Sequence, residues 1–189
     1  MQPDALKKNT TRTYLQSNVS RPSSFYVKCI LNHPEQSLMK TEKDYEEFLA
    51  LLNRHNVRYC IIGAFALAFH IEPRYTKDID ILIEASAENA EKLLTALHEF
   101  GFGSLNLTNS DFSTPGNIIQ LGYEPVRIDI ITSIQGLDFI DIWKNRVQGR
   151  YGDQTVNFIN LDNLIKSKKI SDRPQDRADI ERLQSKHKI

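Results

Sequence analysis

The sequence has little cysteine and no long hydrophobic run, and each of these features excludes a class of protein. Its two cysteines, Cys29 and Cys60, are too few and too isolated for a disulfide framework or a cysteine-based zinc site. No stretch of about 18 apolar residues is available to span a bilayer, and the first residues lack the apolar segment of a signal peptide. We therefore expect a cytoplasmic protein that does not contact a membrane.

An excess of charge of one sign is also lacking. The chain has 24 Lys and Arg against 24 Asp and Glu, which excludes the basic composition of a dedicated nucleic-acid binder. The charge is uneven, because residues 1–40 carry a net +4 and the remainder −4. Residues 1–38 are polar and show no sustained periodicity, so we predict a flexible basic arm followed by one domain over residues 39–189. Within this arm, the apolar run Phe25–Leu31 leaves open an added strand.

Helical and strand patterns alternate along the domain. The hydrophobic spacing predicts helices over 41–53, 64–69, 87–100, 137–146, 161–170 and 174–186, and strands over 58–62, 78–83, 117–121, 126–131 and 155–159. Two of these strands, 117–121 and 126–131, are close enough to form a hairpin, whereas others are joined through helices. This order predicts an α/β (α+β) fold with a mixed central sheet flanked by helices.

The strand 78–83 contains two carboxylates that its composition does not explain. It reads Asp-Ile-Asp-Ile-Leu-Ile, and aspartate is disfavoured in core strands because its carboxylate is costly to bury. Side chains alternate along a strand, so Asp78 and Asp80 lie on one face with Cα atoms roughly 6.6 Å apart. Hard oxygen ligands at this spacing suit Mg²⁺ together with phosphate oxygens. The alternative is a solvated strand end.

Two further features favour a metal or catalytic site at Asp78 and Asp80 over a solvated strand end. Gly63 and Ala64 close the strand 58–62 and open a helix, whose free backbone N–H groups suit a triphosphate. Asp129 lies within Val-Arg-Ile-Asp-Ile-Ile, a second core strand with an unexplained carboxylate. A structural ion pair between Asp129 and Arg127 is the alternative for this strand.

At these positions the sequence resembles the DNA polymerase beta-like nucleotidyltransferase superfamily. The pattern of that superfamily is a strand, a Gly-Gly or Gly-Ser turn, an acid-x-acid strand and a third acid on a later strand. The residues that match it are Gly63, Asp78, Asp80 and Asp129. The resemblance implies the polymerase beta-like fold.

A closer likeness is to small bacterial nucleotidyltransferases related to abortive-infection (AbiEii-type) toxins. The residues that carry it are His70, Arg74, Thr76, Lys168, Arg173, Pro174, Asp176 and Asp179. Ala64 departs from the pattern because relatives have a second Gly or a Ser there, and Ile71 stands where relatives often have Gly. The likeness covers about residues 41–183 and implies a role related to toxin–antitoxin systems.

The resemblance implies transfer of a nucleoside monophosphate from a nucleoside triphosphate, such as ATP, to an acceptor hydroxyl. Two Mg²⁺ or Mn²⁺ ions would be held by the catalytic acids, which are Asp78, Asp80 and Asp129. The nucleotide-binding residues it implies are Gly63, Ala64, Arg74, Thr76 and Lys168. For Arg173, Asp176 and Asp179 we expect a structural network that caps the last helix. The resemblance leaves open whether the acceptor is RNA, protein or a small molecule. It also leaves the oligomeric state open.

Two other classes of protein compete with this interpretation. One is a catalytically inactive nucleotide- or protein-binding module of the same fold, which the loss of a hydroxyl at Ala64 favours. The other is a metal-dependent glycosyltransferase with an Asp-x-Asp motif, which leaves Gly63 and Asp129 unexplained. His70 is interpreted either as a packing residue or as a nucleotide contact.

Overall fold

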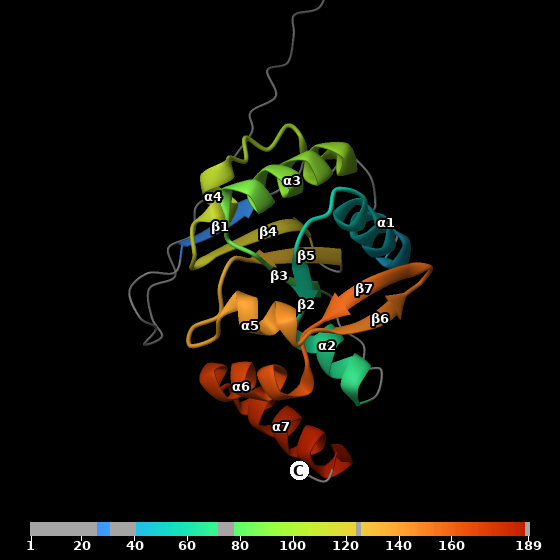
Figure 1. Ribbon diagram of the computed structural model, residues 1–189, viewed down its shortest axis with the longest axis vertical. Helices are drawn as coiled ribbons and strands as arrows, with labels where there is room; N and C mark the ends of the chain where they lie inside the picture. The colour runs from blue at the N-terminus through green and yellow to red at the C-terminus, as the bar shows by residue number, and fades with distance from the viewer. Residues whose placement is uncertain (1–25, 31–40, 72–77, 124–125, 188–189) are drawn as a thin grey trace, which may run out of the picture.

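The computed structural model describes residues 26–30, 41–71, 78–123 and 126–187, which form one mixed sheet surrounded by helices (Figure 1). The strands are β1 (Tyr26–Ile30), β2 (Tyr59–Ile61), β3 (Asp78–Ile83), β4 (Asn117–Tyr123), β5 (Val126–Ile131), β6 (Val147–Tyr151) and β7 (Gln154–Phe158). The helices are α1 (Thr41–Arg54), α2 (Gly63–His70), α3 (Ala87–Leu97), the π-helical turn η1 (His98–Phe102), α4 (Asn109–Ser113), α5 (Phe139–Lys144), α6 (Leu161–Ser171) and α7 (Pro174–His187).

The seven strands lie in the order β1-β4-β5-β3-β2-β7-β6. Parallel pairs (β1 with β4, β3 with β5, β2 with β7) alternate with antiparallel pairs (β4 with β5, β2 with β3, β6 with β7). The mixed sheet and the β4–β5 hairpin confirm the predicted fold class. None of the described helices is long and apolar enough to cross a membrane.

The core lies between the sheet and the helices α1 and α3. Phe48, Leu49 and Leu52 of α1 are at most 1% exposed, and so are Leu93 and Leu97 of α3. These residues recur at intervals of three or four, which places them on one side of each helix. On the other side of the molecule, α6 and α7 pack against each other and against α2 (Figure 1).

The central strand β3 has two different faces. Ile79 and Ile81 are fully buried, whereas the alternate residues Asp78 and Asp80 are only partly buried. A strand that buries one row of isoleucines in a core is fixed in register, because a slip of one residue would bury the aspartates instead. Packing of the isoleucines therefore determines where the two carboxylates lie.

Some elements differ from those predicted. The edge strand β6 was not predicted, because Val-Gln-Gly-Arg-Tyr is mostly exposed and has no apolar alternation. The predicted helix 87–100 ends as an α-helix at Leu97 and continues as a π-helical turn up to Phe102, with Gly101 at φ +105°. The strand β1 lies within the predicted arm and pairs with β4. The boundary at residue 38 stays a prediction.

Candidate active site

The parallel pairing of β3 with β5 brings the three predicted acids together. Asp80 lies opposite Asp129, and Asp78 lies opposite Arg127. Directly opposed residues of neighbouring strands project from the same face of a sheet, so all four side chains share one face. Since Asp129 is 6% exposed while Asp78 and Asp80 are partly buried, the cluster extends from the interior towards the surface.

Arg127 bridges two of these acids. Its Nη2 donates to Asp78 Oδ2 at 2.6 Å and to Asp129 Oδ2 at 3.0 Å, and its Nε donates to Asp129 Oδ1 at 2.8 Å. The Asp129–Arg127 pair left open by the sequence is therefore present. Two further groups that the sequence did not single out support it: Gln120 Nε2 donates to Asp129 Oδ2 at 3.4 Å, and the Tyr45 hydroxyl donates to the Arg127 carbonyl at 3.2 Å. Gln120 follows from the hairpin register, which sets it opposite Asp129.

The turn at Gly63 lies directly against Asp80. Gly63 has φ +62°, and a Cβ atom on it would lie 1.9 Å from Asp80 Oδ2. The preceding residue, Ile62, donates its N–H to the Asp80 carbonyl at 3.0 Å. Only glycine permits both this backbone conformation and this approach. Helix α2 therefore begins at the carboxylate of Asp80, with Ala64 in its first turn.

The start of α2 is suited to an anion. The residue before it, Ile62, forms no side-chain cap, so the first N–H groups of α2 receive no side-chain bond from that position. A helix N-terminus carries a partial positive charge that favours phosphate. The start of α2, which suits an anion, therefore lies next to a group of carboxylates, and nucleotide binding by Gly63 and Ala64 stays a prediction.

The carboxylates perturb one another. Burial, together with the charges of Asp129 and Asp78, raises the pKa of Asp80 to about 7 against the opposing charge of Arg127. Burial also raises the pKa of Asp129, against the hydrogen bond and charge of Arg127. One guanidinium therefore does not offset three carboxylates that share a face, and the cluster favours a further cation.

The residue types fit a divalent ion, although the present side-chain positions do not yet form a cage. Three carboxylates are the hard oxygen donors that Mg²⁺ and Mn²⁺ prefer. Asp80 is partly buried, and its pKa is raised by burial and by like charges. Among the described residues, however, no group of three acidic, histidine or cysteine side chains is gathered around one point. Arg127 Nη2 instead contacts both Asp78 and Asp129.

Lys168 has a different environment from the exposed lysines beside it. It is 7% exposed, and its Nζ donates to Asp176 Oδ1 at 2.9 Å and to Asp179 Oδ2 at 2.8 Å. These bonds join α6 to α7, so Lys168 takes the place in the acidic network that the sequence suggested for Arg173. Arg173 is exposed, and its charge acts on Asp176 and opposes part of the rise in the pKa of Asp80. A triphosphate contact for Lys168 stays a prediction.

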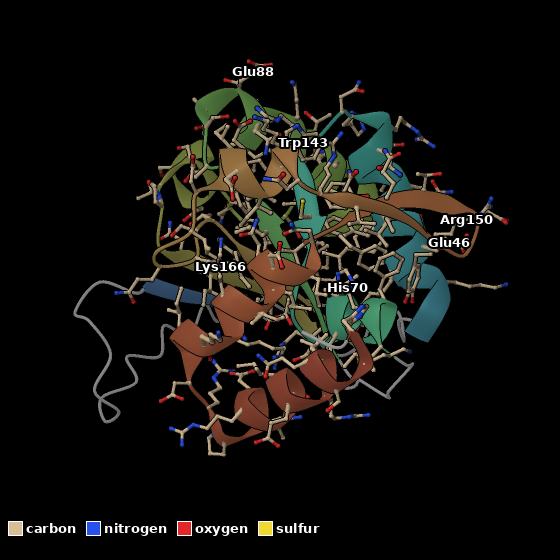
Figure 2. All side chains as sticks on the ribbon, turned by 60° about the horizontal axis from the view of Figure 1, so that its bottom comes forward. Glu46, His70, Glu88, Trp143, Arg150 and Lys166 are labelled. Carbon is tan, nitrogen blue, oxygen red and sulfur yellow. The ribbon has the colours of Figure 1, made fainter. Side chains whose placement is uncertain are left out.

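Three residues that the sequence analysis named remain. Arg74 and Thr76 lie outside the described residues, whereas His70 lies within them. His70, at the end of α2 (Figure 2), bonds through Nε2 to the Ile159 carbonyl at 2.8 Å, and burial lowers its pKa. A ring that bonds to a carbonyl inside the fold fits the packing role, and this contact connects α2 to the segment that follows β7.

With the acids, the glycine turn and the helix end in place, the chain can be compared with known proteins. A family model described as "Nucleotidyl transferase of unknown function (DUF2204)" matches residues 41–188. The chain belongs to this family. The nucleotidyl transferase family model thus covers all of the acids and the Gly63 turn. No curated protein matches the sequence.

Several solved structures are similar to this nucleotidyl transferase. A candidate nucleotidyltransferase (TM1012) from Thermotoga maritima is 14% identical, with 82% of this chain and 99% of that chain covered and a TM-score of 0.51. The lincosamide antibiotic adenylyltransferase LnuA, bound to lincomycin, is 17% identical over 77% of this chain and 97% of that one, with a TM-score of 0.49. An antigenic nucleotidyltransferase-like protein from Paracoccidioides brasiliensis is 19% identical over 75% of each chain, with a TM-score of 0.46. At 14% identity, the similarity to the Thermotoga maritima structure concerns the fold alone.

Proposed function

We propose that this nucleotidyl transferase moves a nucleoside monophosphate from a nucleoside triphosphate to an acceptor hydroxyl, with divalent ions held by Asp78, Asp80 and Asp129. The observation that carries the proposal is the contact between Gly63 and Asp80. It puts the start of α2, which suits phosphates, beside the carboxylates, which suit metal ions. A nucleoside triphosphate complexed with a divalent ion needs both features at one place.

Each part of the site has a role in this reaction. The acceptor hydroxyl loses its proton to water and its oxygen bonds to the α-phosphorus, while the bond from that phosphorus to the bridging β-phosphate oxygen breaks and pyrophosphate leaves with that oxygen. Divalent ions, when bound, supply positive charge to the attacking and leaving oxygens. Asp78 and Asp80 would hold the nucleotide side of the site, and Asp129 would complete the acceptor side. The Gly63–Ala64 turn would receive the phosphates, with Arg74, Thr76 and Lys168 as further proposed contacts.

The rigid placement of the acids supports the proposal. β3 and β5 are central strands whose opposite face is filled by Ile79, Ile81, Ile128 and Ile130, all fully buried. The backbone positions of the acids on such strands keep their spacing without support from substrate. Preorganised charge of this kind accounts for a large part of catalysis in many enzymes.

The acceptor is the open part of the reaction. RNA, a protein hydroxyl or a small molecule are all compatible with the site, and a role related to toxin–antitoxin systems rests on the resemblance alone. A cytoplasmic location likewise stays a prediction. The inactive binding module of the same fold is the competing function, which Ala64 favours because alanine offers no hydroxyl to a phosphate.

Incubation with each α-labelled nucleoside triphosphate, Mg²⁺ or Mn²⁺, and total cell RNA or lysate tests the proposal. We expect label on one class of macromolecule or small product with the wild-type chain and none with Asp78→Ala. Arg150→Met, at the tip of the β6–β7 hairpin (Figure 2), is the matched surface control and should label as the wild type does. Nucleotide binding without any labelled product would favour the inactive module.

A further inference from the structure

The position of Arg127 has a consequence for metal binding. A single nitrogen, Nη2, is bonded to one carboxylate oxygen from each of two neighbouring strands, Asp78 Oδ2 at 2.6 Å and Asp129 Oδ2 at 3.0 Å. Nε adds a second bond to Asp129 at 2.8 Å. The guanidinium is thus the cation that these two acids share.

A metal ion shared by the same two acids needs the same space. An Mg²⁺ ion shared by Asp78 and Asp129 would have to bind the carboxylate oxygens that Nη2 now contacts. Arginine keeps its charge at any ordinary pH, so it cannot be neutralised in place. The guanidinium and a shared ion therefore compete for the same carboxylate oxygens and repel each other.

The side chain of Arg127 can leave without disturbing the sheet. Its backbone is held in β5 by pairing on both sides, with β3 and β4, and its carbonyl accepts the Tyr45 hydroxyl. Its side chain is 26% exposed, so a path to solvent exists. The phosphates of a nucleotide offer a guanidinium an alternative bidentate partner. Nucleotide and metal would then each favour the binding of the other.

We propose that Arg127 is a resident counter-cation that competes with divalent metal for Asp78 and Asp129, so that the ion binds only as the guanidinium leaves. The inference rests on the proposed function, since it concerns the same metal site. It assigns Arg127 a positioning role: in the free protein the arginine keeps two acids in place that would otherwise repel each other.

Calorimetric titration with Mn²⁺ alone at pH 8 measures the competition. Arg127→Met should bind Mn²⁺ about tenfold or more tightly than the wild type, as expected when a close competing charge is removed. Arg150→Met is the matched control, because it removes the same charge from an exposed arginine that pairs with Asp153. It should leave the Mn²⁺ affinity unchanged. Equal or weaker Mn²⁺ binding by Arg127→Met would overturn the competition while leaving the metal site intact.

A second measurement uses the wild-type chain, in case Arg127→Met does not fold. The Arg127 Nε–H nuclear magnetic resonance, assigned with Arg127→Lys, should move towards the position of a solvated guanidinium as Mg²⁺ is added. A resonance that stays fixed while Mg²⁺ binds would overturn the inference. Lack of Mn²⁺ and Mg²⁺ binding by every variant, with and without nucleotide, would overturn the proposed metal site itself and the inference with it.

Discussion

Replacement of Gly63 by alanine should strongly destabilise the fold, for two separable reasons. At φ +62° an L-residue costs roughly 1–2 kcal/mol, because its Cβ crowds the backbone. In addition, the new Cβ would lie 1.9 Å from Asp80 Oδ2 and 2.8 Å from its Cγ, and overpacking of this kind typically costs about 1–3 kcal/mol. We expect Gly63→Ala to lower the free energy of unfolding by about 2–5 kcal/mol.

A double-mutant cycle separates the two parts. Asp80→Ala removes Oδ2 and Cγ and leaves only its Cβ, 3.1 Å from the added atom. In that background Gly63→Ala should cost only the backbone part, about 1–2 kcal/mol. Gly101→Ala is the matched control, since Gly101 has φ +105° but no atom within 4 Å of an added Cβ. Its cost should not depend on Asp80.

Urea unfolding followed by circular dichroism gives all the free energies needed. Coupling between positions 63 and 80 of about 1–3 kcal/mol is the expected result. The reasoning is wrong if Gly63→Ala costs no more than Gly101→Ala, or if it costs the same with and without Asp80.

Three other perturbations test separate parts of the structure. Asp129→Ala should keep most nucleotide affinity but lose transfer on the order of 10²-fold or more, because charge at the reacting centre is removed; a stable variant with undiminished transfer contradicts this. The folded pKa of Asp80 is about 7 against an ordinary 3.8, so without metal the folded state binds this proton more tightly and stability should fall as pH rises from about 4 to 7. Asp80→Asn should remove that fall, which amounts to on the order of 4 kcal/mol at most. Melting-temperature profiles over pH 4–8 that are identical for the wild type and Asp80→Asn would exclude this contribution of Asp80. Lys168→Met removes the buried lysine that Asp176 and Asp179 share and should cost about 3–5 kcal/mol in urea, whereas the exposed Lys169→Met should change stability by under about 0.5 kcal/mol; equal losses would contradict the buried ion pair.

The strong periodic signals in the sequence predicted most of the fold. The isoleucine-rich strands β3 and β5 and the hairpin of β4 with β5 follow from composition and spacing, since burial of one face leaves little freedom. The exposed edge strand β6 was missed because it has no apolar alternation. Its pairing with β7 runs across the two-residue turn Gly152-Asp153, a local hairpin signal that could have identified both strands.

The candidate site, like the fold, could be predicted from the sequence only in part. The three acids are visible in the sequence as carboxylates in core strands, but their mutual placement depends on the parallel register of β3 and β5. The contact of Gly63 with Asp80 needs that register and the β2–β3 pairing as well. The burial of Lys168 could not be predicted, because nothing in its own segment signals the ion pair with Asp179 on the next helix.

The two faces of β3 also bear on how proteins of this fold change over evolution. The isoleucine face holds the domain together, and the aspartate face opposes folding through repulsion between like charges. A lineage that loses its acids therefore loses a source of instability along with the reaction, and selection for stability alone would favour that loss. We expect catalytically silent descendants of this architecture to fold at least as well as the active ones, so that retained aspartates on both β3 and β5 are a sign of continuing selection for chemistry.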